Sequence, residues 1–128
     1  MKQKLVIDTN ILVAALKSPT GKAYRLLDDV LNEKYDIICS EEIFHEYDEV
    51  LHREEFGFEE LYINYILLWF RGHADFVTPL PSTESMIDPD DRIFFDTAKV
   101  RNAKLVTFNL KHYPVHELRT SISELYPD

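Results

Sequence analysis

Three acidic residues lie far apart in the sequence, at positions from which their side chains can reach one edge of a sheet. Asp8 follows an apolar run over 5–7, which is typical of a strand buried on both faces. Glu46 falls on the inner stripe of the helix expected over 41–54. Asp91 begins another helix and shares its apolar face. We therefore expect three carboxylates in one crevice.

Carboxylates brought together in this way repel and raise one another's pKa unless a cation is present. Their oxygens suit Mg²⁺ or Mn²⁺ and not zinc. A cation held by Asp8, Glu46 and Asp91 would activate a water and stabilise the leaving oxygen of a phosphodiester. Asn109 stands where a fourth ligand is useful, because its amide oxygen can ligate weakly or orient a water. These residues predict metal-dependent phosphodiester hydrolysis.

Neighbouring polar residues are expected to support the acids by hydrogen bonding, although each is equally explained as a helix cap or a strand-end residue. The supporting candidates are Thr9, Asn10, Thr107, Asp88 and Asp90. For the last two, local helix chemistry is the alternative explanation, because Asp88 is a natural N-cap before Pro89 and Asp90 in the first turn opposes the helix macrodipole. Arg53 and Lys111 are candidates for contacting a substrate phosphate, with a solvated surface charge as the alternative reading.

The elements that must position these residues alternate between strands and helices. Strands are expected over 5–7, 35–39, 75–78 and 104–107, with a fifth within 118–126. Helices are expected over 9–17, 22–33, 41–54, 59–71 and 89–102. This order predicts an α/β fold, a three-layer α/β/α sandwich with a short, mainly parallel four- to five-stranded sheet and right-handed crossovers.

Two helices carry further expectations. The helix over 59–71 has a heavy apolar and aromatic load, which we expect to pack in the core. Its residues are Leu61, Tyr62, Tyr65, Ile66, Leu68 and Trp69. In the helix over 89–102, Asp96 falls on the arc opposite to Asp91 and is not a candidate for the site.

Composition limits the class of protein. The 128 residues, 45% hydrophobic, fit a single domain over 1–128. A net charge of −9 counts against broad, non-specific nucleic-acid binding, although an acidic metal site accounts for part of it. The single cysteine, Cys39, excludes an internal disulfide and suits a reducing cytoplasm. The chain starts directly on a strand, so we expect neither a signal peptide nor a membrane span.

Several blocks of the sequence, in order, resemble a PIN domain. They are Val6-Ile7-Asp8-Thr9-Asn10, Ser40 with Glu46 and Val50-Leu51-His52-Arg53, Asp88-Pro89-Asp90-Asp91 with Ala98, and Leu105-Val106-Thr107-Phe108-Asn109-Leu110-Lys111-His112-Tyr113-Pro114. More narrowly, the chain resembles toxins of prokaryotic toxin–antitoxin systems (VapC-like toxins). The resemblance implies a cytoplasmic Mg²⁺/Mn²⁺-dependent endoribonuclease, often a homodimer, held inactive by an antitoxin. The family's acids carry over to Asp8, Glu46 and Asp91.

The chain departs from the family pattern at two positions. Many PIN domains have an acid in place of Asn109, and toxin-like members commonly have a small residue in place of Phe108. These departures favour an alternative, a weakly active or inactive PIN-like module that works through dimerisation and binding of a protein partner. A phospho-acceptor receiver domain also has acids at strand ends, but it needs adjacent acids near the first strand, and Asp8-Thr9-Asn10 fits that poorly.

Overall fold

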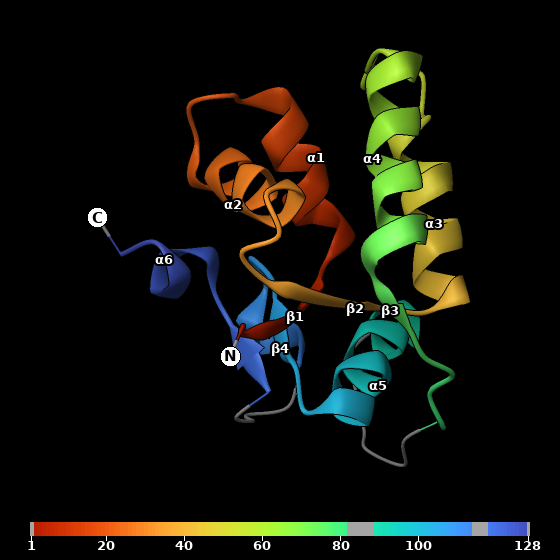
Figure 1. Cartoon of the computed structure of the whole chain (residues 1–128), viewed down its shortest axis with the longest axis vertical. Helices are drawn as coiled ribbons and strands as arrows, with labels where there is room; N and C mark the ends of the chain where they lie inside the picture. Colours follow the sequence, from red (N-terminus) through yellow and green to blue (C-terminus); the bar gives the residue numbers. More distant parts are fainter. Residues whose placement is uncertain (1, 82–88, 114–117, 128) are drawn as a thin grey trace.

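The computed structural model describes residues 2–81, 89–113 and 118–127. Five short strands form one sheet in the order β3-β2-β1-β4-β5, and every neighbouring pair is parallel (Figure 1). The strands are β1 (Lys4–Ile7), β2 (Asp36–Cys39), β3 (Asp75–Phe76), β4 (Lys104–Val106) and β5 (Arg119–Thr120). The predicted fifth strand in the tail is therefore present as a two-residue edge strand.

Helices cover both faces of this sheet. The helices are α1 (Thr9–Lys17), α2 (Lys22–Leu31), α3 (Glu41–Leu51), α4 (Glu60–His73), α5 (Arg92–Arg101) and α6 (Ile122–Leu125), with 3-10 turns η1 (Pro89–Asp91) and η2 (Leu110–His112). Helices α1 to α4 lie on one face and α5 on the other (Figure 1). From β1 to β3 the chain moves across the sheet in one direction, and from β3 to β4 it moves back in the other. Because the crossovers are right-handed, the connection that moves back, which contains α5, lies on the opposite face. The predicted α/β sandwich is confirmed.

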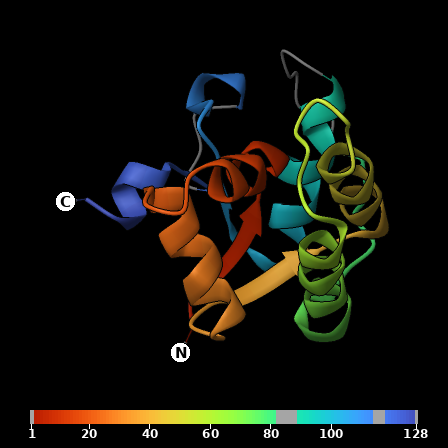
Figure 2. The same cartoon turned by 90° about the horizontal axis from the view of Figure 1, so that it is seen from above.

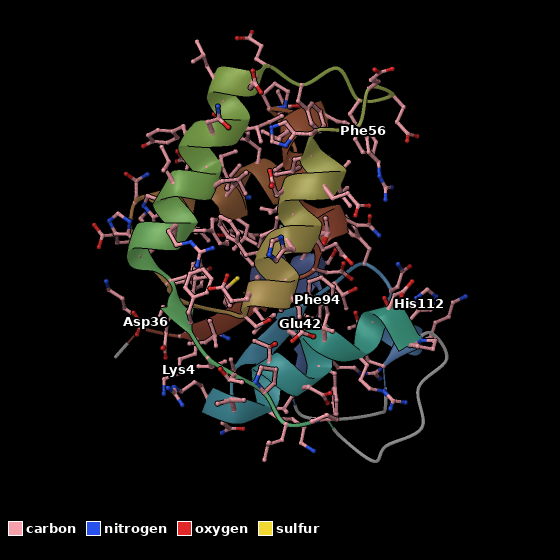
Figure 3. All side chains as sticks on the ribbon, turned by 90° about the vertical axis from the view of Figure 1, so that its right-hand side faces the viewer. Lys4, Asp36, Glu42, Phe56, Phe94 and His112 are labelled. Carbon is pink, nitrogen blue, oxygen red and sulfur yellow. The ribbon has the colours of Figure 1, made fainter. Side chains whose placement is uncertain are left out.

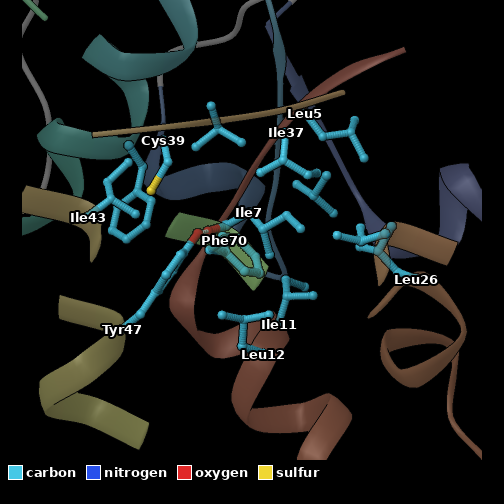
Figure 4. Packing of buried hydrophobic residues seen from close by; sticks show 14 of the residues in the cluster. Leu5, Ile7, Ile11, Leu12, Leu26, Ile37, Cys39, Ile43, Tyr47 and Phe70 are labelled. Atoms are coloured by element: carbon cyan, nitrogen blue, oxygen red, sulfur yellow. Dashed lines mark hydrogen bonds between the residues drawn. The ribbon is translucent and has the colours of Figure 1, made fainter. Parts of the chain in front are cut away.

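The core forms around β1, whose apolar residues Leu5, Val6 and Ile7 are fully buried. Figure 4 shows Tyr47 of α3 reaching the end of β1, where its hydroxyl donates a hydrogen bond to the Ile7 carbonyl. The Tyr47 ring also meets Phe70 of α4 edge-on, with centroids 5.3 Å apart. These contacts fix α3 against the strand that ends at Asp8.

Most predicted boundaries differ from the observed ones by a few residues. Helix α3 ends at Leu51, three residues before the expected end, and α2 ends at Leu31. Ser40 caps α3 as its type predicts, because its hydroxyl accepts the Ile43 N–H at 3.3 Å. The helix expected from Pro89 begins as the 3-10 turn η1, and α5 ends at Asn102 in the left-handed conformation (φ 54°).

The prediction that the apolar stripe of α4 packs in the core is wrong for most of its residues. Leu61, Tyr65 and Leu68 are 83, 58 and 72% exposed, and Tyr62 is also exposed. The buried face instead consists of Ile63, Ile66, Leu67 and Phe70. Because α4 is apolar nearly all round, its periodicity does not reveal which face meets the rest of the protein.

Asp96 is buried, a feature on which the sequence made no prediction. The residue lies on the arc of α5 opposite to Asp91, yet only 7% of it is exposed, because both arcs of α5 are covered. Asp96 borders a hollow with Leu80 and Val100, on a different part of the surface from Asp8.

Figure 2 places the α3–α4 pair on the opposite side of the molecule from α6 and the C-terminus. Within the described ranges, no helix has the length and apolar character that crossing a bilayer requires.

Candidate active site

The predicted site lies where the strand order of the sheet reverses. Strand β1 continues through α1 and α2 to β2 on one side, whereas its other neighbour, β4, comes from the far end of the chain. Ligands of open α/β sheets bind outside the carboxyl ends of the strands at such a switch point. The Asp8 N–H donates to the Val106 carbonyl at 3.0 Å, so the residues that follow β1 and β4 are held side by side.

Asp8 caps α1 and is 7% exposed. Its Oδ1 accepts the backbone N–H of Asn10 at 3.4 Å, and its Oδ2 accepts the hydroxyl of Thr107 at 2.8 Å. Burial raises the pKa of Asp8 above its ordinary value, and the Thr107 hydrogen bond partly opposes this. The structure thus gives Asp8 a capping role and also places it among the residues of the switch point.

Glu46 faces inward from α3, as its place in the sequence predicts. It is half-buried, and its Oε2 accepts the hydroxyl of Thr9, the residue after Asp8. Burial raises the pKa of Glu46, the Thr9 hydrogen bond lowers it, and the negative charges of Asp8, Asp90 and Asp91 raise it further. Asp8 and Asp91 therefore both lie within electrostatic reach of Glu46.

Asp91 ends η1 and occupies the N-cap position of α5, but its side chain makes no capping hydrogen bond. Helix capping therefore does not explain why an acidic residue occupies this position. Its Oδ2 lies 3.5 Å from Nδ1 of His112 in η2, and the side chain is 21% exposed. Figure 3 shows His112 beside the first turn of α5, with Phe94 of that helix turned toward the core.

Asn109 and Phe108 follow β4 directly. The Asn109 N–H donates to the Thr107 hydroxyl oxygen at 3.0 Å, so one hydroxyl joins Asn109 to Asp8. Asn109 is half-buried. Phe108 lies between Thr107 and Asn109 in the sequence, and it is 48% exposed. The bulky ring that distinguishes this chain from the family pattern is therefore partly exposed, on the residue that follows Thr107.

Sequence reasoning assigned no role to the two residues after Lys111. His112 pairs with Asp91, and its charge, when present, lowers the pKa of Asp8. Tyr113 is 3% exposed, and its buried hydroxyl interacts with the Asp8 carboxylate without making a hydrogen bond of ordinary geometry to any described residue. Burial raises the pKa of Tyr113, followed by the charges of Asp8, Asp91 and Glu46. Both residues follow β4, a strand at the switch point, and this position in the sequence is the signal that could have identified His112 and Tyr113 as candidates.

The remaining predicted residues are less closely involved. Asn10 contacts Asp8 through its backbone and not its side chain. Asp90 is exposed, and Asp88 lies outside the described residues. Arg53 is exposed and pairs with Glu49 at 3.3 Å, one helical turn away. Lys111 is exposed in η2.

The donor set fits a hard divalent cation in its chemistry. It consists of carboxylates whose charge is disfavoured by burial and, for Glu46, also by repulsion from Asp8 and Asp91, and the buried Tyr113 hydroxyl interacts with Asp8. No three His, Cys, Asp or Glu side chains among residues 2–81, 89–113 and 118–127 converge closely enough to hold one ion. Two carboxylates completed by water suit Mg²⁺, which usually keeps several waters.

Comparison with known proteins gives one assignment. A search of curated proteins finds no match for this chain. The family model described as PIN domain matches residues 4–111, which include β1 to β4 and all the acids discussed above. The chain therefore belongs to the PIN domain family, whose members are generally nucleases.

Proposed function

We propose that this protein is a Mg²⁺- or Mn²⁺-dependent endoribonuclease and the toxin of a toxin–antitoxin pair. The observation that supports the proposal is that, in a PIN domain, the charges of Asp8 and Asp91 both act on Glu46. Buried like charges of this kind are costly unless a cation neutralises them.

Asp8 and Asp91 would be the principal metal ligands, and Glu46 would ligate or orient the attacking water. Thr107 holds Asp8 and Thr9 holds Glu46, so neither carboxylate has to be ordered when substrate arrives. Asn109 would assist through its amide oxygen. When bound, the cation supplies an activated water and stabilises the leaving oxygen of the phosphodiester.

The proposed partners follow from this reading. The substrate is RNA, and a cognate antitoxin protein is the expected inhibitor. Arg53 and Lys111 are exposed cations that can meet a substrate phosphate, although Arg53 would first have to leave Glu49. With a net charge of −9, the chain has few other features that attract a polyanion.

A single experiment tests the activity. Mixed single-stranded RNA is incubated with the protein in EDTA and after addition of Mn²⁺, and the same reactions are run with Asp8→Asn and Asp91→Asn. We expect Mn²⁺-dependent cleavage by the natural protein and none by either variant. The matched control is Asp36→Asn, which removes an exposed carboxylate at the amino end of β2, visible at the opposite edge in Figure 3. Full activity of Asp8→Asn would reject the mechanism.

A second candidate is a PIN-like module with little catalysis that acts by binding a protein partner. The exposed Phe108 ring beside Thr107 and Asn109 favours it, because a bulky side chain there narrows access to the acids. Under this reading the natural protein cuts neither RNA nor single-stranded DNA at any Mn²⁺ concentration, and Phe108→Gly, which removes the ring, restores cleavage.

A further inference from the structure

The side chain of Arg119 joins the edge strand β5 to the turn η2. Its Nη1 donates to the backbone carbonyl of Leu110, the first residue of η2, and to that of Tyr113, the C-cap of the turn, at 3.4 Å. A guanidinium carries several N–H donors in one plane, so a single side chain can bridge two carbonyls. Arg119 therefore ties both ends of η2 to the sheet.

The turn η2 has few contacts of its own that hold it in place. It is a three-residue 3-10 helix, a form with poor hydrogen-bond geometry, and none of its residues is buried. Its N-cap residue, Asn109, makes no side-chain capping hydrogen bond. Within the turn, the N–H of His112 donates to the Asn109 carbonyl at 2.9 Å and that of Tyr113 to the Leu110 carbonyl at 3.2 Å. The hydrogen bonds from Arg119 are therefore a substantial part of what holds η2.

The residues at the end of η2 meet the acids of the candidate site. His112 Nδ1 lies 3.5 Å from Asp91 Oδ2, and the Tyr113 hydroxyl interacts with the Asp8 carboxylate. The hydrogen bonds of Arg119 within the described part of the chain go instead to backbone carbonyls. Any effect of Arg119 on the acids is therefore transmitted through η2.

Strand β5 gives this tie a fixed base. It pairs with β4, with Arg119 opposite Leu105, and the N–H of Thr107 donates to the Thr120 carbonyl at 3.1 Å. Arg119 also lies outside residues 4–111, the range that the PIN domain model matches. Membership of the family therefore assigns no role to this arginine.

We propose that Arg119 is a positioning residue of the candidate active site. By holding η2, it keeps His112 against Asp91, and it likewise keeps Tyr113 against Asp8. In this way Arg119 sets the affinity of the acids for a divalent cation. The inference rests on the proposed function, because it concerns the cation site of that function.

The affinity for Mn²⁺, measured by calorimetry, separates positioning from an effect of charge. Removing a positive charge strengthens the attraction of an acidic protein for a cation, whereas loss of positioning in Arg119→Met is expected to weaken Mn²⁺ binding about tenfold or more. The matched control is Arg101→Met, which removes the same charge from an ion pair with the exposed Asp75, the first residue of β3. It should bind Mn²⁺ at least as tightly as the natural protein. Arg119→Lys, which keeps the charge and N–H donors on a shorter stem, should recover part of the affinity, and it carries the same measurements if the methionine variant does not fold.

Hydrogen exchange in EDTA tests the tie itself without metal. In Arg119→Met, the amides of His112 and Tyr113 should exchange about threefold to tenfold faster, the effect of losing roughly one hydrogen bond. The Thr107 amide, which donates to β5, should keep its rate. If the Thr107 amide accelerates equally, β5 has been lost, the role of Arg119 is purely structural and the inference is overturned. An Arg119→Met variant that binds Mn²⁺ as tightly as Arg101→Met also overturns it, while the proposed function stands. A natural protein that binds no Mn²⁺ rejects the proposed function, and with it this inference, whatever the exchange rates are.

Discussion

The hydroxyl of Thr107 donates a hydrogen bond to Asp8 Oδ2 over 2.8 Å, although the two residues are 99 positions apart in the chain. The same oxygen accepts the N–H of Asn109. Since a hydroxyl has one proton to donate, accepting from Asn109 leaves that proton available for Asp8. The end of β4 therefore sets the orientation of the carboxylate that follows β1.

Replacing Thr107 with valine should weaken both the fold and metal binding. The variant keeps the shape of the side chain but leaves a buried carboxylate oxygen and the Asn109 N–H without this partner, which costs about 1–3 kcal/mol of unfolding free energy. Loss of such an orienting partner typically reduces metal affinity about tenfold to a hundredfold. Urea unfolding and Mn²⁺ calorimetry measure the two effects. Thr107→Ser retains the hydroxyl and should resemble the natural protein; equal Mn²⁺ affinity of the valine and serine variants would contradict the assigned role.

Asp8 should make the metal-free fold less stable at neutral pH. Its pKa is higher in the folded than in the unfolded protein, so its ionised form opposes folding above the folded pKa, and this penalty disappears as the pH falls to the ordinary value. Asp8→Asn should therefore melt at a higher temperature than the natural protein at neutral pH in EDTA, and the difference should shrink on acidification.

Saturating Mn²⁺ should reverse this order, because a bound ion stabilises only the protein that binds it. Thermal unfolding followed by circular dichroism, with and without Mn²⁺, measures both halves of the prediction. Asp36→Asn serves as the control, since that carboxylate is exposed at the other end of the sheet. An Asp8→Asn variant that is less stable than the natural protein in EDTA would show that burial is not the dominant influence on Asp8.

Tyr113→Phe should weaken metal binding without destabilising the metal-free protein. The variant removes a buried hydroxyl that makes no hydrogen bond of ordinary geometry to a described residue, although it interacts with Asp8, so the unfolding free energy in EDTA should stay the same or rise by up to about 1 kcal/mol. Because the charges of Asp8, Asp91 and Glu46 act on this hydroxyl, its loss should also weaken Mn²⁺ binding. Denaturant unfolding and Mn²⁺ titration of the same sample test both expectations, and a destabilised phenylalanine variant would refute the first.

The sequence predicted well the features that depend on short-range physics. The apolar run before Asp8, the serine cap at Ser40 and the inward position of Glu46 follow from local patterns, and all three are observed. The ends of helices were predicted less accurately because the sequence signals for helix termination are weak: α3 ends at Leu51, with His52 at its C-cap and no glycine or proline there. The exposed face of α4 and the burial of Asp96 could not be read from periodicity, since both depend on which elements pack nearby.

By itself, the sequence determined the order of strands and helices, their approximate limits and the identity of the acids, because side-chain pattern and capping act over a few residues. Only the tertiary structure decided that β1 and β4 are neighbours, which brings Thr107 to Asp8 and Tyr113 and His112 to the acids. It also decided that Leu61, Tyr65 and Leu68 face outward. These relationships join residues distant in the chain, and strand pairing and packing create them only once the whole sheet has formed.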